Sequence, residues 1–254
     1  MTYCLGILSK EGIAGLADTR ITSGNDTTVA KKIFTVQREK HTFFIMTSGL
    51  RSVRDKAITY FGEVIEEQDE QFTKLYQAVN EFGKQVKRAA AEDKESLKES
   101  GMNFNLNAIV GGQLEEDDCP KLYLLYPQGN WIEIGKGTPY VIIGNTGFGN
   151  PVLKRSLSHE SSLEFGLKSG FLSFDATRIS ANDVAYPIDT VILRKNEFKL
   201  IEHRFNEEDL GHISSFWNSR LKDAIDKLPA VALSKAFQNE EQMKILEDAP
   251  EDQP

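Results

Sequence analysis

Cysteine and histidine are scarce in this chain, and neither residue type recurs at a spacing that holds a metal. Among 254 residues there are 2 cysteines, Cys4 and Cys119, and 4 histidines, scattered at positions 41, 159, 203 and 212. Two cysteines supply no disulfide framework, so a reducing compartment is the simplest setting. The histidines form no HExxH-like set. We therefore expect a cytoplasmic protein that uses neither a metal nor another cofactor.

Long apolar runs and an excess of positive charge are also missing. No apolar run approaches the ~20 residues that a membrane-spanning helix needs, and the N-terminus lacks the basic region and apolar core of a signal peptide. The formal net charge is −8, which argues against a nucleic-acid-binding surface as the main function. Membranes and nucleic acids are therefore not expected partners.

What the chain does have is enough apolar sequence for one well-packed domain. Its apolar fraction is 40%, and its glycine and proline counts are modest. Much of the acidity lies in residues 63–70, 115–118 and 207–209 and in the tail over residues 240–252. We expect a single domain over residues 2–238, followed by an acidic, flexible tail over residues 239–254.

The beginning of the chain has the pattern of strands separated by short turns. Residues 2–8 are apolar, residues 10–12 form a turn, and residues 13–17 form a second apolar run that ends at Asp18. A hairpin here would return Asp18 to the start of the chain. A polar loop is expected over residues 22–28. Two further strands are expected over 33–36 and 42–46, and the second leads to Ser48 and Gly49.

Thr2 is the first candidate functional residue. Removal of Met1 would leave a hydroxyl and a free α-amine on the same residue, which is a nucleophile with its own base. An α-amine titrates near pH ~7.7–8.0, so a useful neutral fraction exists at cellular pH. Many proteins begin Met-Thr, so the evidence for this chemistry must come from the residues that follow.

The order of motifs after Thr2 resembles the proteasome β-subunit-like family of N-terminal threonine hydrolases. That family has a Gly-Ile pair in its first strand and an Ala-Asp-Ser/Thr-Arg motif at the end of its second. A lysine opens its third strand, and a Ser-Gly or Ala-Gly pair closes its fourth. The matching segments here are Gly6-Ile7, Ala17-Asp18-Thr19-Arg20, Lys32 and Ser48-Gly49. Residues 143–151 and 186–189 resemble the bacterial branch called Anbu, the ancestral β-subunit.

The resemblance implies a threonine protease that cuts peptides or unfolded proteins and forms a homo-oligomer, as a ring, a stacked ring or a helical array. Thr2 would attack the carbonyl carbon. Lys32, held in place by Asp18, would lower the pKa of the Thr2 hydroxyl through its charge. The backbone N–H of Gly49 would stabilise the oxyanion, a contact typically worth ~3 kcal/mol. Arg20 would support the wall of the site.

Each of these residues also has a purely structural interpretation. Asp18 at a strand end could cap a turn, and Gly49 could serve only the turn that it begins. Lys32 and Arg20 could be solvated at the surface, as most such residues are. Lys31 and Lys32 face opposite sides of a strand, so only one of them can point toward the nucleophile. We choose Lys32 because it directly precedes the apolar strand, as the lysine does in the family.

Two segments depart from the family pattern. Active proteasome subunits carry a late Asp-x-x-Ser pair that orients the amine, whereas this chain has Ser180 and Asp183 in the reverse order, and Asn145 stands near a family serine. The alternative function is therefore a catalytically weak or inactive subunit with a structural or regulatory role. A third alternative, an acylase that uses Cys4, is weaker because Cys4 is not at the end of the chain.

The rest of the chain alternates between helical and strand patterns. Helices are expected after Gly49 and over 71–91, 150–157, 163–176 and 207–228, with a polar linker over 93–101. Strands are expected over 105–110, 121–126, 131–134, 140–143, 189–194 and 197–202. This order fits two sheets enclosed between two helical layers. We therefore predict an α+β fold, the four-layer αββα sandwich of the N-terminal nucleophile (Ntn) hydrolases.

Overall fold

The structure is a computed structural model that describes residues 2–23, 26–68 and 71–229. The chain divides into two compact units, Met1–Ile213 and Ser214–Pro254. The fold and the site below belong to the first unit, and helix α5 (Glu207–Asp226) begins there and continues into the second. The acidic tail expected over residues 239–254 lies outside the described residues. Within the described ranges, no helix combines the length and the hydropathy that a membrane span requires.

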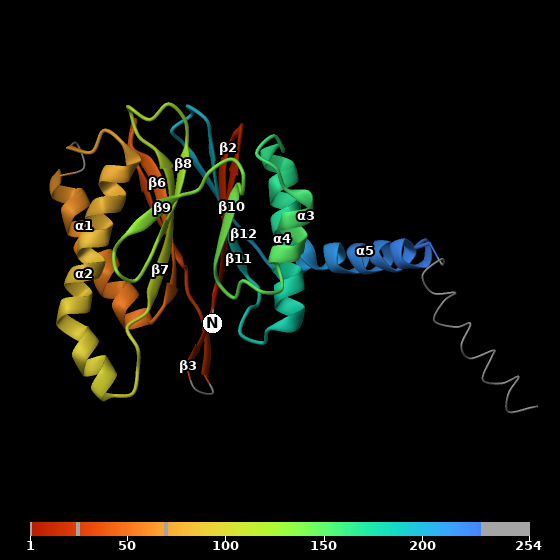
Figure 1. The fold of residues 1–254 in the computed structure, drawn as a ribbon, viewed down its shortest axis with the longest axis horizontal. Helices are drawn as coiled ribbons and strands as arrows, with labels where there is room; N and C mark the ends of the chain where they lie inside the picture. Colours follow the sequence, from red (N-terminus) through yellow and green to blue (C-terminus); the bar gives the residue numbers. More distant parts are fainter. Residues whose placement is uncertain (1, 24–25, 69–70, 230–254) are drawn as a thin grey trace, which may run out of the picture. The chain divides into compact units, whose positions relative to one another are not determined.

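Two antiparallel sheets of five strands each form the middle of the first unit (Figure 1). Along the first sheet the strand order is β10-β1-β2-β11-β12, and along the second it is β5-β6-β7-β8-β9. The strands of the first sheet are β1 (Tyr3–Ser9), β2 (Gly12–Asp18), β10 (Tyr140–Gly144), β11 (Ile188–Arg194) and β12 (Leu200–Phe205). The strands of the second are β5 (Ile33–Gln37), β6 (Thr42–Gly49), β7 (Leu106–Gln113), β8 (Lys121–Leu125) and β9 (Trp131–Glu133).

Helices cover the outer face of each sheet, so the layers follow the order helix, sheet, sheet, helix (Figure 1). Helices α1 (Arg51–Gln68) and α2 (Leu75–Glu99) lie on the second sheet, and α3 (Asn150–Ser156) and α4 (Leu163–Ser180) lie on the first. In β6, Phe43 and Ile45 pack toward the α1–α2 layer, and Phe44 and Met46 pack toward the other sheet. This arrangement confirms the predicted αββα sandwich.

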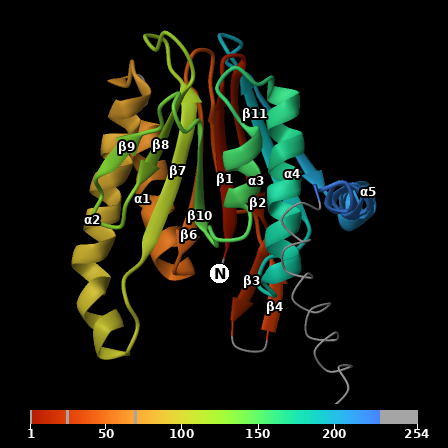
Figure 2. The same cartoon turned by 45° about the vertical axis from the view of Figure 1, so that its right-hand side comes forward.

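The prediction of a polar loop over residues 22–28 was wrong. Strands β3 (Arg20–Ser23) and β4 (Asp26–Val29) pair there as a separate two-stranded sheet, with Ile21 opposite Thr28. Isoleucine, threonine and valine favour strands, and the prediction gave too much weight to the polar residues between them. The hairpin and the start of β1 lie at the same end of the sandwich (Figure 1, Figure 2).

The prediction of a polar linker over residues 93–101 was also wrong, because α2 continues to Glu99. Glutamate, lysine and leucine in this stretch are good helix formers. Asp93 forms an ion pair with Lys56 of α1 at 2.7 Å, and Leu97 packs against the apolar cluster between the two helices and the sheet. The stretch is polar because one face of the helix meets solvent.

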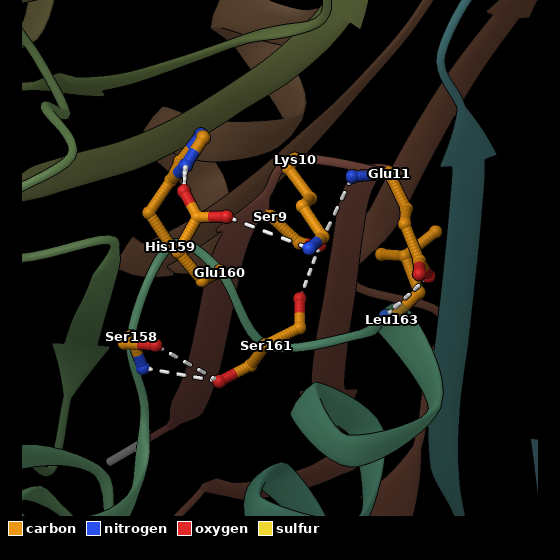
Figure 3. A network of polar contacts seen from close by, with 8 residues as sticks. All are labelled: Ser9, Lys10, Glu11, Ser158, His159, Glu160, Ser161 and Leu163. Atoms are coloured by element: carbon orange, nitrogen blue, oxygen red, sulfur yellow. Dashed lines mark hydrogen bonds and ion pairs between the residues drawn. The ribbon is translucent and has the colours of Figure 1, made fainter.

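The far end of β1 is tied to the helical layer by a polar network (Figure 3). In the turn between β1 and β2, the Lys10 N–H donates to the carbonyl oxygen of His159 at 2.9 Å. The neighbouring Glu11 carboxylate accepts the N–H of Leu163, the first residue of α4, at 2.9 Å. A carboxylate in this position satisfies a donor that the helix itself leaves free. The network therefore fixes the β1–β2 hairpin against α4, at the end opposite Thr2.

Candidate active site

A buried ion pair between Asp18 and Lys32 is the centre of the candidate site. Asp18 is the last residue of β2, and Lys32 directly precedes β5. The Lys32 ammonium nitrogen lies 2.7 Å from Oδ1 of Asp18, and the two side chains are 3% and 0% exposed. The backbone N–H of Tyr3 also donates to Oδ1, at 2.8 Å, and that of Arg20 donates to Oδ2 at 3.2 Å. The carboxylate thus accepts from the ammonium and from two backbone groups.

The surroundings of Asp18 act on its pKa in opposite directions. Burial raises the pKa of the carboxyl above its ordinary value, and the Lys32 charge and the N–H donors of Tyr3 and Arg20 oppose that rise. Removing one member of such a pair leaves an uncompensated charge in the protein interior. Each of the two residues therefore compensates the charge of the other inside the protein.

The structure brings Lys32, and not Lys31, to Asp18. Lys31 points to the other side, where its ammonium nitrogen lies 2.5 Å from Oε2 of Glu202 and its side chain is 49% exposed. Adjacent residues in an extended chain point to opposite sides, so only one of the two lysines can reach Asp18. The role of Lys32 in catalysis stays a prediction.

Thr2 lies on the wall of a cleft of about 850 Å³ that also includes Lys32 and Gly49. Its carbonyl oxygen accepts the N–H of Asn145 at 2.7 Å, and its neighbour Tyr3 pairs with Gly144 of β10. The backbone around Thr2 is therefore held from β10 on one side and from Asp18 on the other. Asn145, which the sequence placed near a family serine, contacts Thr2 through its backbone N–H.

Two glycines with positive φ shape the cleft. Gly49 has a φ of +138°, and a Cβ there would lie 2.0 Å from the carbonyl oxygen of Asn105. Gly144 has a φ of +87°, and a Cβ there would lie 1.9 Å from the carbonyl oxygen of Thr2. Both the conformation and the space require glycine. Gly49 thus stands on the cleft wall, and its predicted role as oxyanion donor stays a prediction.

Neither Ser180 nor Asp183 is among the described residues that line the cleft. Ser180 is the last residue of α4, which runs beyond the expected end at residue 176, and its hydroxyl donates to the carbonyl oxygen of Ala176 at 3.0 Å. Asp183 is half-buried, and burial acts to raise its pKa. Hydrogen bonding and nearby positive charge outweigh burial and hold the pKa of Asp183 below its ordinary value, and Lys32 makes the smallest of these contributions. The electrostatic influence of Lys32 therefore extends to Asp183.

Arg20 and Cys4 complete the residues singled out by the sequence. Arg20 lies on the cleft wall, and its buried Nε has no hydrogen-bond partner among the described residues. Cys4 is fully buried in β1, with Sγ 3.8 Å from the carbonyl oxygen of Thr47. Burial raises the pKa of the Cys4 thiol far above its ordinary value. A thiol in that state is a poor nucleophile, which argues against the Cys4 alternative.

The side of the cleft opposite β1 is formed by residues that the motifs of the sequence did not indicate. These are the first residues of α1 and three asparagines just before and within β7: Arg51, Arg54, Asn103, Asn105 and Asn107. One signal was available, because α1 begins two residues after Gly49, so its first turn must lie beside that glycine. The asparagines had no such signal, since only the pairing of β6 with β7 brings them to the cleft.

Comparisons with known proteins identify the family of this chain and its fold. The proteasome subunit family matches residues 2–169. A search of the curated proteins finds no significant match.

Among solved structures, an Anbu (Gly-1) mutant from Hyphomicrobium sp. strain MC1 has a TM-score of 0.84 and 28% identity, over 90% of this chain and 98% of that one. Anbu from Yersinia bercovieri has a TM-score of 0.83 at 24% identity, over 90% and 98% of the two chains, and supports the fold alone. A structure described as a helical assembly of the Anbu complex from Pseudomonas aeruginosa has a TM-score of 0.83 and 25% identity, over 90% and 97%. The chain therefore belongs to the proteasome subunit family, and it is similar to the Anbu branch of that family.

Proposed function

We propose that this chain is a threonine-type peptidase whose nucleophile is the Thr2 hydroxyl, exposed for catalysis when Met1 is removed. The observation that carries the proposal is the buried Asp18–Lys32 pair on the cleft where Thr2 lies. A protonated lysine beside a hydroxyl lowers the pKa of that hydroxyl, and Asp18 keeps the lysine charged in a buried position.

In the proposed reaction, the α-amine of Thr2 accepts the hydroxyl proton, directly or through one water, as Oγ attacks the peptide carbonyl carbon. The backbone N–H of Gly49 stabilises the resulting oxyanion. The proton then passes to the leaving amine as the peptide bond breaks, and an ester forms between the acyl group and Thr2. A water molecule, deprotonated by the same amine, hydrolyses the ester and regenerates the hydroxyl.

Two carboxylates have separate roles in this scheme. Asp18 acts on Lys32 and, through the Tyr3 N–H, on the backbone that carries the nucleophile. We assign the orientation of the amine to Asp183, because an aspartate is ionised at neutral pH and the charge of Lys32 acts on this one. Ser180 would support that site only after its hydroxyl turned away from the carbonyl oxygen of Ala176.

We also propose that the protein works as a cytoplasmic homo-oligomer on peptides or unfolded proteins. The support for assembly is the similarity to the Pseudomonas aeruginosa structure, which is described as a helical assembly. A catalytically weak or inactive subunit is the second candidate function. The observation that favours this candidate is the Ser180 hydroxyl, which is bonded within α4 instead of being free to serve the amine.

The test is intact mass measurement and N-terminal sequencing after exposure to a peptide epoxyketone. This electrophile forms a ring with a hydroxyl and a free amine on one residue, so it reports both groups of Thr2 together. We expect the mature chain to begin at Thr2 and to carry one adduct there. The Thr2→Ala variant should carry none. An unlabelled, folded wild-type protein, or a mature chain that retains Met1, would overturn the proposal in favour of the inactive subunit.

A further inference from the structure

The cleft that holds Thr2 is lined by positive charge. Four cationic side chains line it, and among the described residues no carboxylate does. The cationic residues are Arg20, Lys32, Arg51 and Arg54. A cleft lined by charges of one sign concentrates ligands of the opposite sign.

These positive charges are only partly neutralised by nearby carboxylates. Lys32 has Asp18 as its partner, and its charge also acts on Asp183. Arg51 and Arg54 share a single partner, Asp55, whose oxygens lie 3.4 Å and 2.6 Å from them. Asp55 itself is 51% exposed, so solvent weakens its hold on both guanidinium groups. The first turn of α1 therefore carries one more positive charge than its partners neutralise, and Arg20 adds another.

The surplus charge of the two α1 arginines lies close in sequence to Gly49, the proposed oxyanion donor. Arg51 and Arg54 are three residues apart on a helix and so share one face. Both lie within the five residues that come after Gly49 in the chain. The N-terminus of α1 adds the positive end of the helix dipole, and no acidic residue stands in its first turn. Arg54 is the more enclosed of the two, with 16% of its side chain exposed against 60% for Arg51.

The remaining polar groups of the cleft suit an anion as well. Asn103, Asn105 and Asn107 line it, and their amide groups can donate without adding negative charge. The Asn107 amide already donates to Asn105 Oδ1 at 3.1 Å, which orders the pair. The buried Thr47 hydroxyl, also on the cleft wall, has no hydrogen-bond partner within the described part of the chain.

We infer that the cleft selects peptides with an aspartate or glutamate on the acyl side of the scissile bond, bound through Arg54 and Arg51. This inference rests on the proposed threonine peptidase function and names its substrate class. Arg54 donates to Asp55 through Nε and one terminal nitrogen, and an acidic side chain would pair with the N–H groups that Asp55 does not take. An apolar side chain would cover those remaining donors without pairing them. A basic side chain would meet charge of the same sign.

The test is the hydrolysis of fluorogenic peptides that differ only in the residue before the scissile bond. The series has Glu, Gln, Leu or Arg at that position, and kcat/KM is measured for each with the full-length protein. A charge-assisted hydrogen bond in a partly enclosed site predicts a Glu-to-Gln ratio of about tenfold or more. The Arg peptide should be the poorest substrate.

Three variants separate recognition of charge from a structural role. Arg54→Gln should lower the Glu-to-Gln ratio to about one, and Arg54→Lys should restore part of it. Asp55→Asn should raise the ratio, because it frees both arginines from their shared carboxylate, and loss of structure alone would not do so. Arg194→Gln is the control, because this exposed arginine at the end of β11 does not line the cleft.

The labelling of Thr2 by a neutral epoxyketone distinguishes the two possible failures. Labelling without any preference for Glu, or a preference that Arg54→Gln leaves unchanged, overturns the acidic specificity and leaves the peptidase intact. Absence of labelling on a folded protein overturns the peptidase, and the specificity falls with it.

Discussion

The N–H of Tyr3 and the carboxylate of Asp18 are joined by a buried hydrogen bond of 2.8 Å, on the same oxygen that receives the Lys32 ammonium. One oxygen atom thus serves both the backbone that carries Thr2 and the cation proposed to activate it. Because the contact is to the first peptide group after Thr2, any shift of Asp18 moves the nucleophile and the lysine together. This coupling makes Asp18 a positioning residue for two parts of the proposed reaction.

Replacing Asp18 with asparagine should destabilise the fold strongly. The change leaves the Lys32 charge buried without a carboxylate, and breaking a buried pair in this way costs about 3–5 kcal/mol. Urea unfolding of the purified variant measures the loss. The control is Glu202→Gln, which removes the partner of the exposed Lys31 and should cost about 0–1 kcal/mol. Equal losses in the two variants would show that the Asp18–Lys32 pair is not energetically special.

Replacing Lys32 with alanine should slow epoxyketone labelling of Thr2. Loss of one preorganised electrostatic group at a reacting centre typically costs about 10²–10³-fold in rate, and we expect a reduction of that size. Mass spectrometry of time-resolved labelling measures it. Lys31→Ala is the matched control, since Lys31 faces Glu202 on the other side, and its labelling rate should equal that of the wild type. If Lys31→Ala slows labelling as much as Lys32→Ala, the assignment of the lysine is wrong.

Replacing Gly144 with alanine should disturb the cleft and the fold. The new Cβ would meet the carbonyl oxygen of Thr2, and the φ of +87° disfavours any other residue. We expect a loss of about 1–3 kcal/mol in the free energy of unfolding, together with slower Thr2 labelling. Gly62→Ala in the interior of α1 is the control, because a Cβ there meets nothing within 4 Å. That change should stabilise the protein by about 0.5–1 kcal/mol. Tolerance of Gly144→Ala would mean that the backbone at Thr2 is free to move.

Because the Cys4 thiol is buried, we expect the free energy of unfolding to fall at alkaline pH. The pKa of the thiol in the folded protein lies above that of the unfolded chain, about 8.5, so the contribution is fully present below that pH and is lost as the pH rises above it. Between pH 7.5 and 9.5 the loss from this group should be about 1.4 kcal/mol.

Urea unfolding of the wild type and of Cys4→Ala at the two pH values isolates this contribution. The variant lacks the titrating group, so its stability should fall by less than that of the wild type over the same interval. An identical fall in both proteins would mean that the thiol of Cys4 ionises as readily in the folded protein as in the unfolded chain.

The local sequence pattern was sufficient to predict that Asp18 lies near the start of the chain and that Lys31 and Lys32 point to opposite sides. The β1–β2 hairpin returns Asp18 to the start of the chain because two apolar strands are joined by a short turn. The strand alternation that separates Lys31 from Lys32 is likewise a property of neighbouring residues. The sequence predicted two elements incorrectly. It placed the end of α2 too early, and it predicted a loop where β3 and β4 pair.

The sequence by itself determined the order of the layers and the placement of Asp18 near the chain start, because backbone periodicity and turn length act over short distances. Only the tertiary structure decided what faces the nucleophile. Arg54 and Asn107 reach one cleft because β6 pairs with β7 and leads into α1, and Ser180 is bonded within α4 because the helix runs to that residue. Such positions depend on packing between segments far apart in the chain, and residue type carries little information about that packing.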